Sequence, residues 1–123
     1  MASKKVALIE DERDLAEIYD MKLKMDGILT VVINDSSLAL EILKKELPNL
    51  ILLDIMMPDL DGFSLFAQIR NEKELKSSKI YIWSNLTQKK EKERAAQLKV
   101  DGYLVKSEYT PASLSQKVKE LLK

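Results

Sequence analysis

Acidic, hydroxyl and ammonium side chains end four short apolar runs of this chain. The first run ends in Glu10 and Asp11, the third in Asp54, the fourth in Ser84 and the fifth in Lys106. Clustered carboxylates raise one another's pKa values unless a cation lies among them. Each residue taken singly also has a structural explanation, but the joint pattern predicts one site in which Lys106 and a divalent ion balance the carboxylates.

The residue types of the chain restrict that ion and its chemistry. The 123 residues include no cysteine and no histidine. Thiol nucleophiles, His-based catalytic triads, zinc sites built on Cys or His, and a phosphohistidine of its own are therefore excluded. Oxygen ligands remain, and they favour Mg²⁺, which prefers carboxylate, water and phosphate oxygens. We expect Mg²⁺ as the cofactor.

Five apolar runs, rich in Val, Ile and Leu, are the elements that must position these side chains. Runs that are nearly continuous rather than alternating are typical of strands buried on both faces of a parallel sheet. Segments long enough for helices separate them, so we predict an α/β, doubly wound, five-stranded parallel sheet flanked by five helices. The ligand crevice of such a sheet lies at the carboxyl ends of its strands. The predicted strands span residues 6–10, 30–34, 50–54, 80–84 and 103–106.

Apolar residues at helical spacing predict the helices. The last helix has Thr110 as its N-cap and Pro111 as its first residue. The fourth, after Thr87, has no apolar residue before Ala95, so its first two turns should be solvated. The apolar faces of the other helices and of the last are predicted to comprise, in order, Leu15, Ile18, Tyr19 and Met25; Ala39, Ile42 and Leu43; Leu65, Phe66 and Ile69; and Leu114, Val118, Leu121 and Leu122.

Composition and charge bound the class of protein. Hydrophobic residues make up 46% and charged residues 33%, which suits one folded domain over residues 1–123. Twenty basic and twenty acidic residues cancel, so we expect no direct binding of nucleic acid. The first apolar run is too short for a signal peptide or a membrane span. We therefore expect a cytoplasmic protein without membrane attachment.

Four spaced motifs of the chain resemble those of one protein family. They are LIEDERDL at residues 8–15, LLDIMMPDLDG at 52–62, WSN at 83–85 and GYLVKS at 102–107. Together they make the chain similar to the receiver domain of response regulators, over essentially its whole length. The resemblance implies a flavodoxin-like topology with strand order 2-1-3-4-5 and a role in bacterial two-component signalling.

The resemblance also implies roles for the acidic residues. Asp54 would be the nucleophile that takes a phosphoryl group. Asp11 and Asp54 would bind Mg²⁺ with the backbone carbonyl of Met56, and Glu10 would hold the metal largely through water. Phosphoryl transfer of this kind relies on positioning and electrostatics, which these residue types can supply.

Further residues and partners follow from the same resemblance. Ser84 and Lys106 would contact the phosphoryl oxygens, and Ser84 with Tyr103 would form the conformational switch. The phosphodonor would be a sensor histidine kinase or a histidine phosphotransfer protein, and the downstream protein target is not identified. The domain, a monomer or weak homodimer, would catalyse its own phosphorylation and slow dephosphorylation but act mainly as a switch.

Two positions depart from the family pattern. Asn85 replaces the small residue that usually follows the hydroxyl, and Ser107 replaces the proline that usually follows the lysine through a cis peptide bond. A cis bond costs about 2.5–4 kcal/mol before a residue other than proline, against about 0.5–1 kcal/mol before proline. The Lys106–Ser107 bond should therefore be trans. Trp83 is larger than expected at its position and is predicted to pack on the fourth helix.

One alternative function remains open, and the sequence argues against two others. The chain could be a receiver-like interaction module that is not switched by phosphorylation. A phosphatase with an aspartyl nucleophile would need a second Asp two residues later, where this chain has Met56. A flavin or nucleotide binder would need a glycine-rich phosphate loop, which Gly27, Gly62 and Gly102 cannot form.

Overall fold

The computed structural model describes residues 4–57, 60–85 and 89–123. Its main sheet has five parallel strands in the order β2-β1-β3-β6-β7, which is the predicted order 2-1-3-4-5. An additional short antiparallel pair, β4 with β5, was not predicted and follows β3 directly. The strands are β1 (Lys5–Ile9), β2 (Leu29–Ile33), β3 (Leu50–Leu53), β4 (Met56–Met57), β5 (Leu60–Asp61), β6 (Lys79–Ser84) and β7 (Gly102–Val105).

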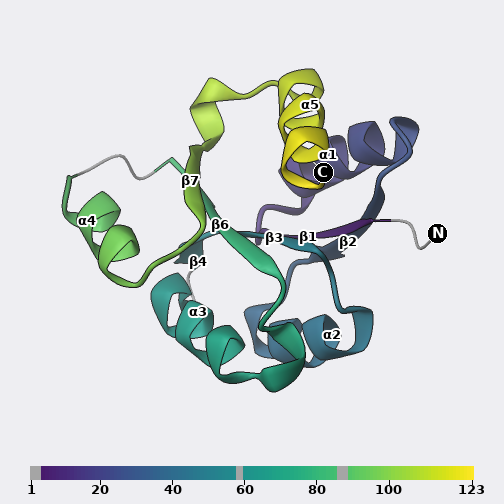
Figure 1. Ribbon diagram of the computed structural model, residues 1–123. Helices are drawn as coiled ribbons and strands as arrows, with labels where there is room; N and C mark the ends of the chain where they lie inside the picture. Colours follow the sequence, from purple (N-terminus) through teal and green to yellow (C-terminus); the bar gives the residue numbers. More distant parts are fainter. Residues whose placement is uncertain (1–3, 58–59, 86–88) are drawn as a thin grey trace.

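Helices cover both faces of this sheet, as predicted. Helices α1 and α5 lie on one face, and α2 and α3 lie on the other (Figure 1). The described residues form five α-helices and three short 3-10 turns, which are α1 (Arg13–Met25), η1 (Ser36–Leu38), α2 (Ala39–Glu46), α3 (Gly62–Asn71), η2 (Lys73–Leu75), α4 (Lys89–Gln97), η3 (Lys106–Glu108) and α5 (Pro111–Leu121).

The central strands separate two apolar cores. Leu52 of β3 packs in the cluster with residues of α1 and α5, whereas its neighbour Leu53 packs in the cluster with residues of α2 and α3. Both side chains are fully buried. Because successive strand residues point to opposite faces, a strand covered on both sides must be apolar throughout. This explains the continuous apolar runs and confirms the doubly wound architecture.

The predicted apolar face of α1 was partly wrong. Ile18 is 52% exposed and Met25 is 77% exposed, while Ala16, Tyr19 and Leu23 are buried. Helix α1 carries two apolar stripes, and the stripe that contains the small Ala16 is the one that packs on the sheet. Hydrophobicity alone cannot distinguish two such stripes, because the choice depends on the shape of the facing surface.

Helix α5 begins as the sequence predicted. The Thr110 hydroxyl accepts a hydrogen bond from the Ser113 amide at 3.1 Å, and the Ser113 hydroxyl accepts one from the Thr110 amide at 2.8 Å. Pro111 is the first helical residue. This reciprocal capping satisfies amides that have no partner within the helix.

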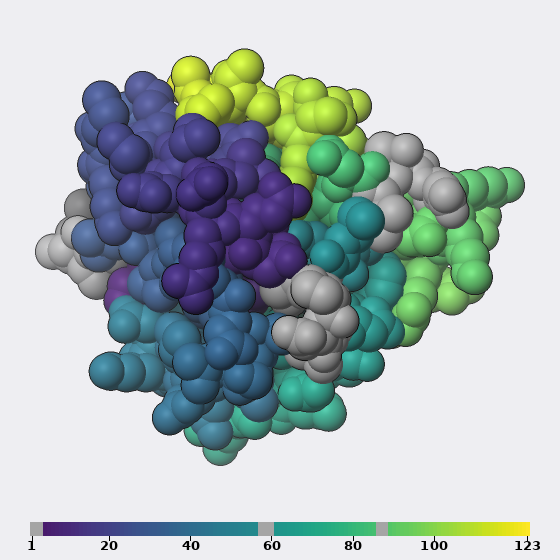
Figure 2. All heavy atoms as spheres, turned by 180° about the vertical axis from the view of Figure 1, so that it is seen from behind, coloured from purple at the N-terminus to yellow at the C-terminus, as the bar shows by residue number. Residues whose placement is uncertain are grey.

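Helix α4 projects from the side of the molecule (Figures 1 and 2). Ala95 is the residue that it buries, and the charged residues before it are exposed as predicted, except Glu91, which is half-buried. Thr87 lies outside the described residues. Arg94 connects α4 to the start of α3, through an ion pair with Asp61 at 3.2 Å and a position 4.5 Å from the centre of the Phe63 ring. Within the described part of the chain, no helix is long and apolar enough to cross a membrane.

We predict that Gly62→Ala destabilises the protein and displaces the loop that follows Asp54. A Cβ atom at Gly62 would lie 2.4 Å from the Cα atom of Ile55, a backbone atom that cannot move aside alone. Overpacking of this kind costs about 1–3 kcal/mol of unfolding free energy. Urea unfolding would measure the loss. The control is Ser64→Ala, an exposed position of the same helix, and equal midpoints for the two variants would contradict the prediction.

Candidate functional site

Glu10 and Asp54 lie side by side because their strands are neighbours. They follow β1 and β3, whose last residues, Ile9 and Leu53, are paired in the sheet. The backbone of each continues the ladder, since the Glu10 amide donates to the Ile33 carbonyl at 3.0 Å and the Asp54 amide to the Ile9 carbonyl at 3.1 Å. The sheet therefore fixes the origin of both side chains.

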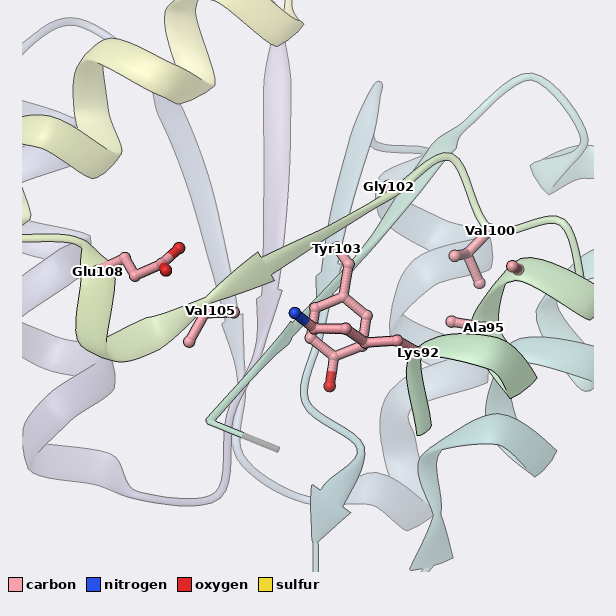
Figure 3. A pocket seen from close by; sticks show the side chains of 8 residues that line it. Lys92, Ala95, Val100, Gly102, Tyr103, Val105 and Glu108 are labelled. Atoms are coloured by element: carbon pink, nitrogen blue, oxygen red, sulfur yellow. The ribbon is translucent and has the colours of Figure 1, made fainter. Parts of the chain in front are cut away.

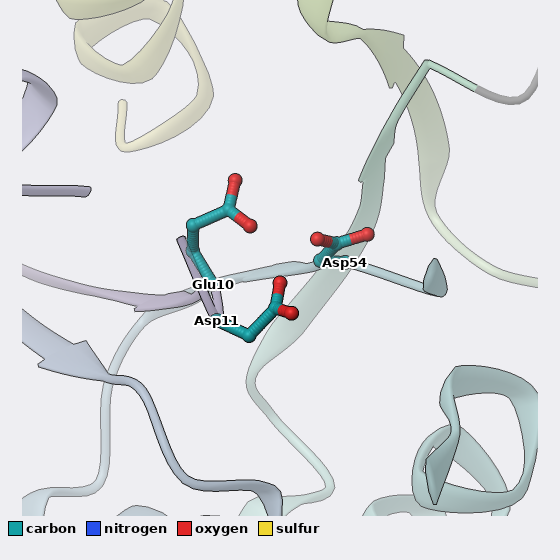
Figure 4. Close-up of side chains that lie close together, drawn as sticks. All are labelled: Glu10, Asp11 and Asp54. Carbon is teal, nitrogen blue, oxygen red and sulfur yellow. The ribbon is translucent and has the colours of Figure 1, made fainter. Parts of the chain in front are cut away.

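Three carboxylates meet at this end of the sheet. Glu10, Asp11 and Asp54 each offer an oxygen atom, and the three oxygens lie within 4.8 Å of one another (Figure 4). Glu10 is fully buried and Asp54 is 2% exposed. The predicted convergence of the acidic residues is confirmed, although Glu10 and Asp54 begin one position after their strands rather than ending them.

Lys106 brings a positive charge to the two buried acids. It follows β7, and its ammonium donates hydrogen bonds to Asp54 Oδ2 at 3.0 Å and to Glu10 Oε1. The predicted convergence of Lys106 with the acids is thus confirmed, and the lysine bridges both carboxylates. Residues 96 and 52 positions apart in the sequence meet here.

The remaining oxygens of the acids differ in their bonding. Asp54 Oδ1 accepts a hydrogen bond from the Met56 amide at 2.8 Å. Glu10 Oε2 is buried and has no hydrogen-bond partner among the described residues. A buried carboxylate oxygen without a partner is costly, and a cation would satisfy it. The oxygen donors fit Mg²⁺ as the sequence suggested, while the role of the Met56 carbonyl stays a prediction.

Burial dominates the electrostatics of the site. It raises the pKa of Glu10 to about 8, and the neighbouring Asp54 adds to this rise more than Lys106 offsets it. Burial also lowers the pKa of Lys106, but its contacts with the two acids outweigh this and hold the pKa above its ordinary value. The metal-free site therefore holds a charged Lys106 ammonium beside a Glu10 carboxyl that keeps its proton up to about pH 8.

Ser84 and Tyr103 lie on the neighbouring strands of the same sheet. Ser84 is the fully buried last residue of β6, and Tyr103 lies on β7. Burial raises the pKa of Tyr103, and a hydrogen bond with Ser84 acts in the opposite direction. The tyrosine also lines a hollow of about 400 Å³ between α4 and the segment from β7 to Glu108 (Figure 3).

The predicted environment of Trp83 was wrong. Its indole ring is fully buried on the α1 and α5 side of the sheet, where it packs edge-on against Tyr19 at 5.3 Å and near Tyr109 at 6.0 Å between ring centres. Trp83 does not belong to the core that faces α4 because strand residues alternate and Ser84 takes the other face. Strand pairing decides the side, and an isolated aromatic residue does not reveal it.

The two departures from the family pattern are in contact. The Asn85 Oδ1 atom accepts a hydrogen bond from the Ser107 amide at 2.7 Å. The peptide bond between Lys106 and Ser107 is trans, as predicted. Sequence reasoning identified both positions but missed their connection. The sequence did hold a hint of this contact: Asn85 and Ser107 each follow a residue of the expected site, and both differ from the family pattern.

Comparison with known proteins agrees with this geometry. Residues 6–119 match the family model of the response regulator receiver domain. The chain belongs to this family of two-component signalling domains. The acids, Lys106, Ser84 and Tyr103 therefore belong to a receiver domain.

Relatives of this receiver domain include longer regulators. It is 30% identical over its whole length to the probable transcriptional regulator ycf27 of Porphyridium aerugineum, covering 50% of that protein. It is 27% identical over 98% of its length to the alkaline phosphatase synthesis transcriptional regulatory protein PhoP of Bacillus subtilis, covering 49% of that protein. The chain thus spans about half the length of the curated relatives it matches.

Solved structures show the same fold. The chemotaxis protein CheY4 of Vibrio cholerae has a TM-score of 0.88 at 23% identity, covering 98% of this chain and all of that one. The receiver domain of the Francisella response regulator 1452 has a TM-score of 0.83 at 28% identity, with 98% and 97% covered. The five-stranded sheet and its helices are therefore those of CheY-like receivers.

We predict that the metal-free receiver domain loses stability as the pH rises toward about 8. The folded state keeps a proton on Glu10 up to about pH 8, whereas the ordinary pKa of a glutamate carboxyl is 4.5. The folded state then binds more protons than the unfolded chain between these values, so the free energy of unfolding falls as pH rises. Urea midpoints measured at several pH values would show the slope.

Glu10→Gln should flatten this slope because an amide does not titrate. Glu12→Gln, which changes an exposed neighbouring carboxylate, should keep the slope of the parent. A parent midpoint that rises steadily from about pH 5 to about pH 8 would contradict the assignment to Glu10.

Proposed function

We propose that Asp54 accepts a phosphoryl group from a phosphohistidine of a partner protein, with Mg²⁺ held by Glu10, Asp11 and Asp54. The arrangement around Asp54 carries this proposal. Its Oδ2 lies 3.0 Å from the Lys106 ammonium, and two further carboxylates lie within reach of one cation. A carboxylate nucleophile beside a cation and a metal-binding acid cluster suits phosphoryl transfer.

The transfer needs one bond to form and one to break. An Asp54 oxygen attacks phosphorus in line, the phosphorus–nitrogen bond of the phosphohistidine breaks, and its electron pair stays on the imidazole of the partner. Bound Mg²⁺ would supply positive charge beside the carboxylates and the phosphoryl oxygens. The chain itself orients the nucleophile, since the Met56 amide holds Asp54 Oδ1 and the sheet holds its backbone.

Lys106 and Ser84 would receive the new phosphoryl oxygens. The ammonium already contacts Asp54, so it can follow the charge from the carboxylate to the phosphoryl group without leaving the site. A charge-assisted hydrogen bond of this kind is about twice as strong as a neutral one. The Ser84 hydroxyl would add a second donor from the adjacent strand.

Tyr103 would report this event to the surface. In the described structure Ser84 hydrogen-bonds to Tyr103, and a phosphoryl group would compete for the same hydroxyl. Loss of that bond would free the tyrosine to reorient. Because Tyr103 lines the hollow beside α4, its reorientation would reshape a surface that a partner can contact.

The partners follow from this chemistry. The donor would be a sensor histidine kinase or a histidine phosphotransfer protein. The recipient of the signal would be a downstream protein that is not identified. We propose that all three proteins act in the cytoplasm. The balanced charge of the chain gives no support to direct nucleic-acid binding. We propose a monomer or weak homodimer, with residues 1–123 acting as one receiver domain.

We predict that Asp54→Asn abolishes phosphoryl uptake and keeps the fold. The change is nearly isosteric and removes the charge of the nucleophile, while Lys106 keeps its contact with Glu10. Intact mass after incubation with acetyl phosphate and Mg²⁺ should show one added phosphoryl group in the parent and none in the variant.

The matched control is Asp61→Asn, which should be labelled like the parent. Asp61 caps α3 by accepting a hydrogen bond from the Phe63 amide at 3.0 Å, and asparagine caps helices equally well. Labelling of Asp54→Asn would show that another acid is the acceptor; Asp59 lies outside the described residues. An unlabelled parent would instead favour an interaction module that phosphorylation does not switch.

A further inference from the structure

A single hydrogen bond joins the two loops that carry the proposed phosphoryl-binding groups. Asn85 directly follows Ser84, and Ser107 directly follows Lys106. The Asn85 side chain accepts from the Ser107 amide at 2.7 Å, across 22 positions of sequence. We call this hydrogen bond between Asn85 and Ser107 the loop latch.

The loop latch forms where the backbone needs an acceptor. Ser107 lies in the first turn of η3, whose amides have no acceptor within the turn itself. The N-cap residue Val105 supplies no side-chain bond either. Asn85, the residue after β6, therefore caps η3 with its side chain rather than through the sheet.

The latch also extends the link between β6 and β7 past the end of their ladder. The last backbone pair of these strands is Ser84 with Val105. Beyond this pair no ladder contact remains, and the connection is made instead by Asn85, one residue after Ser84, and Ser107, two residues after Val105. A movement of the Ser84 backbone toward Asp54 would therefore either stretch the latch or move the turn that carries Lys106.

Asn85 and Ser107 are chemically dependent on each other. Proline at position 107 would lack the amide hydrogen and would place a ring carbon where the Asn85 oxygen now accepts. A small side chain at position 85 would leave the Ser107 amide without its acceptor. Each departure from the family pattern thus makes sense only beside the other.

We propose that Asn85 is a positioning residue that, through the loop latch, holds Ser84 and Lys106 in register over Asp54 and so sets the rate of phosphoryl uptake. This inference rests on the proposed function. Preorganised donors raise the rate of phosphoryl transfer because no reorganisation is needed at the moment of reaction. Release of the latch leaves both donors attached to separate loops and slows the transfer.

Four variants test the latch. Asn85→Ala removes the acceptor. Ser107→Pro removes the donor and crowds Asn85. The double variant Asn85→Ala with Ser107→Pro removes both groups and the crowding. Ser107→Ala keeps the backbone donor and is the matched control. Uptake from acetyl phosphate with Mg²⁺, followed by intact mass, gives the rate, and exchange of the Ser107 amide hydrogen followed by NMR reports the bond itself.

We expect Asn85→Ala to slow uptake severalfold and to speed exchange of the Ser107 amide by about twofold to tenfold, the factor that corresponds to one net hydrogen bond. Ser107→Pro should be slower still, and the double variant should recover uptake relative to Ser107→Pro. Ser107→Ala should match the parent in both measurements. Urea midpoints confirm that each variant is folded, and Asn85→Ala alone carries the test if Ser107→Pro does not fold.

Two results would overturn the latch while leaving the proposed function intact. The first is unchanged Ser107 exchange in Asn85→Ala, which would mean that the bond is not formed in solution. The second is a set of uptake rates that shows no dependence on the latch. Either Asn85→Ala takes up phosphoryl groups as fast as the parent, or the effects of Asn85→Ala and Ser107→Pro on the rate simply add in the double variant. If the parent takes up no phosphoryl group at all, the proposed function and the positioning role fail together.

Discussion

The burial of two carboxylates beside one ammonium is the constraint on which this structure depends. Glu10 and Asp54 lose nearly all contact with solvent, and Lys106 is their shared cation among the described residues. Removing the ammonium would leave both buried acids without their cation, which costs several kcal/mol. The residues that follow β1, β3 and β7 must therefore lie close together at one end of the sheet. The closely packed cores on both faces of the sheet hold the strands in the positions that this requires.

The same burial costs folding free energy that apolar side chains at these positions would not cost. This cost connects the fold with the proposed chemistry. The pKa of Glu10 rises to about 8 because solvent is excluded and Asp54 is near. One oxygen of Glu10 has no partner in the described structure. Repulsion and an unsatisfied oxygen are both relieved by a cation, so the features that cost folding energy are those that favour Mg²⁺ and a phosphoryl group.

Precision at the site comes from contacts just beyond the strand ends. The sheet fixes where each side chain begins, but the loops decide where it points. The Met56 amide orients Asp54. The lack of a side chain at Gly62 lets Ile55, the residue after Asp54, approach the start of α3 closely. Asn85 joins the loop after β6 to the turn after β7. Each contact links a residue of the site to the chain next to it, so small changes outside the acids can alter their geometry.

The sequence by itself determined the architecture and the convergence of Asp54 with Lys106, because strand burial leaves continuous apolar runs and parallel strands end on one side. Only the tertiary structure decided the buried stripe of α1, the side on which Trp83 packs, and the bond between Asn85 and Ser107. These three features depend on how surfaces and loops distant in sequence fit together. The spacing of apolar residues shows which faces of a helix or strand can be buried. It does not show which surface each face packs against.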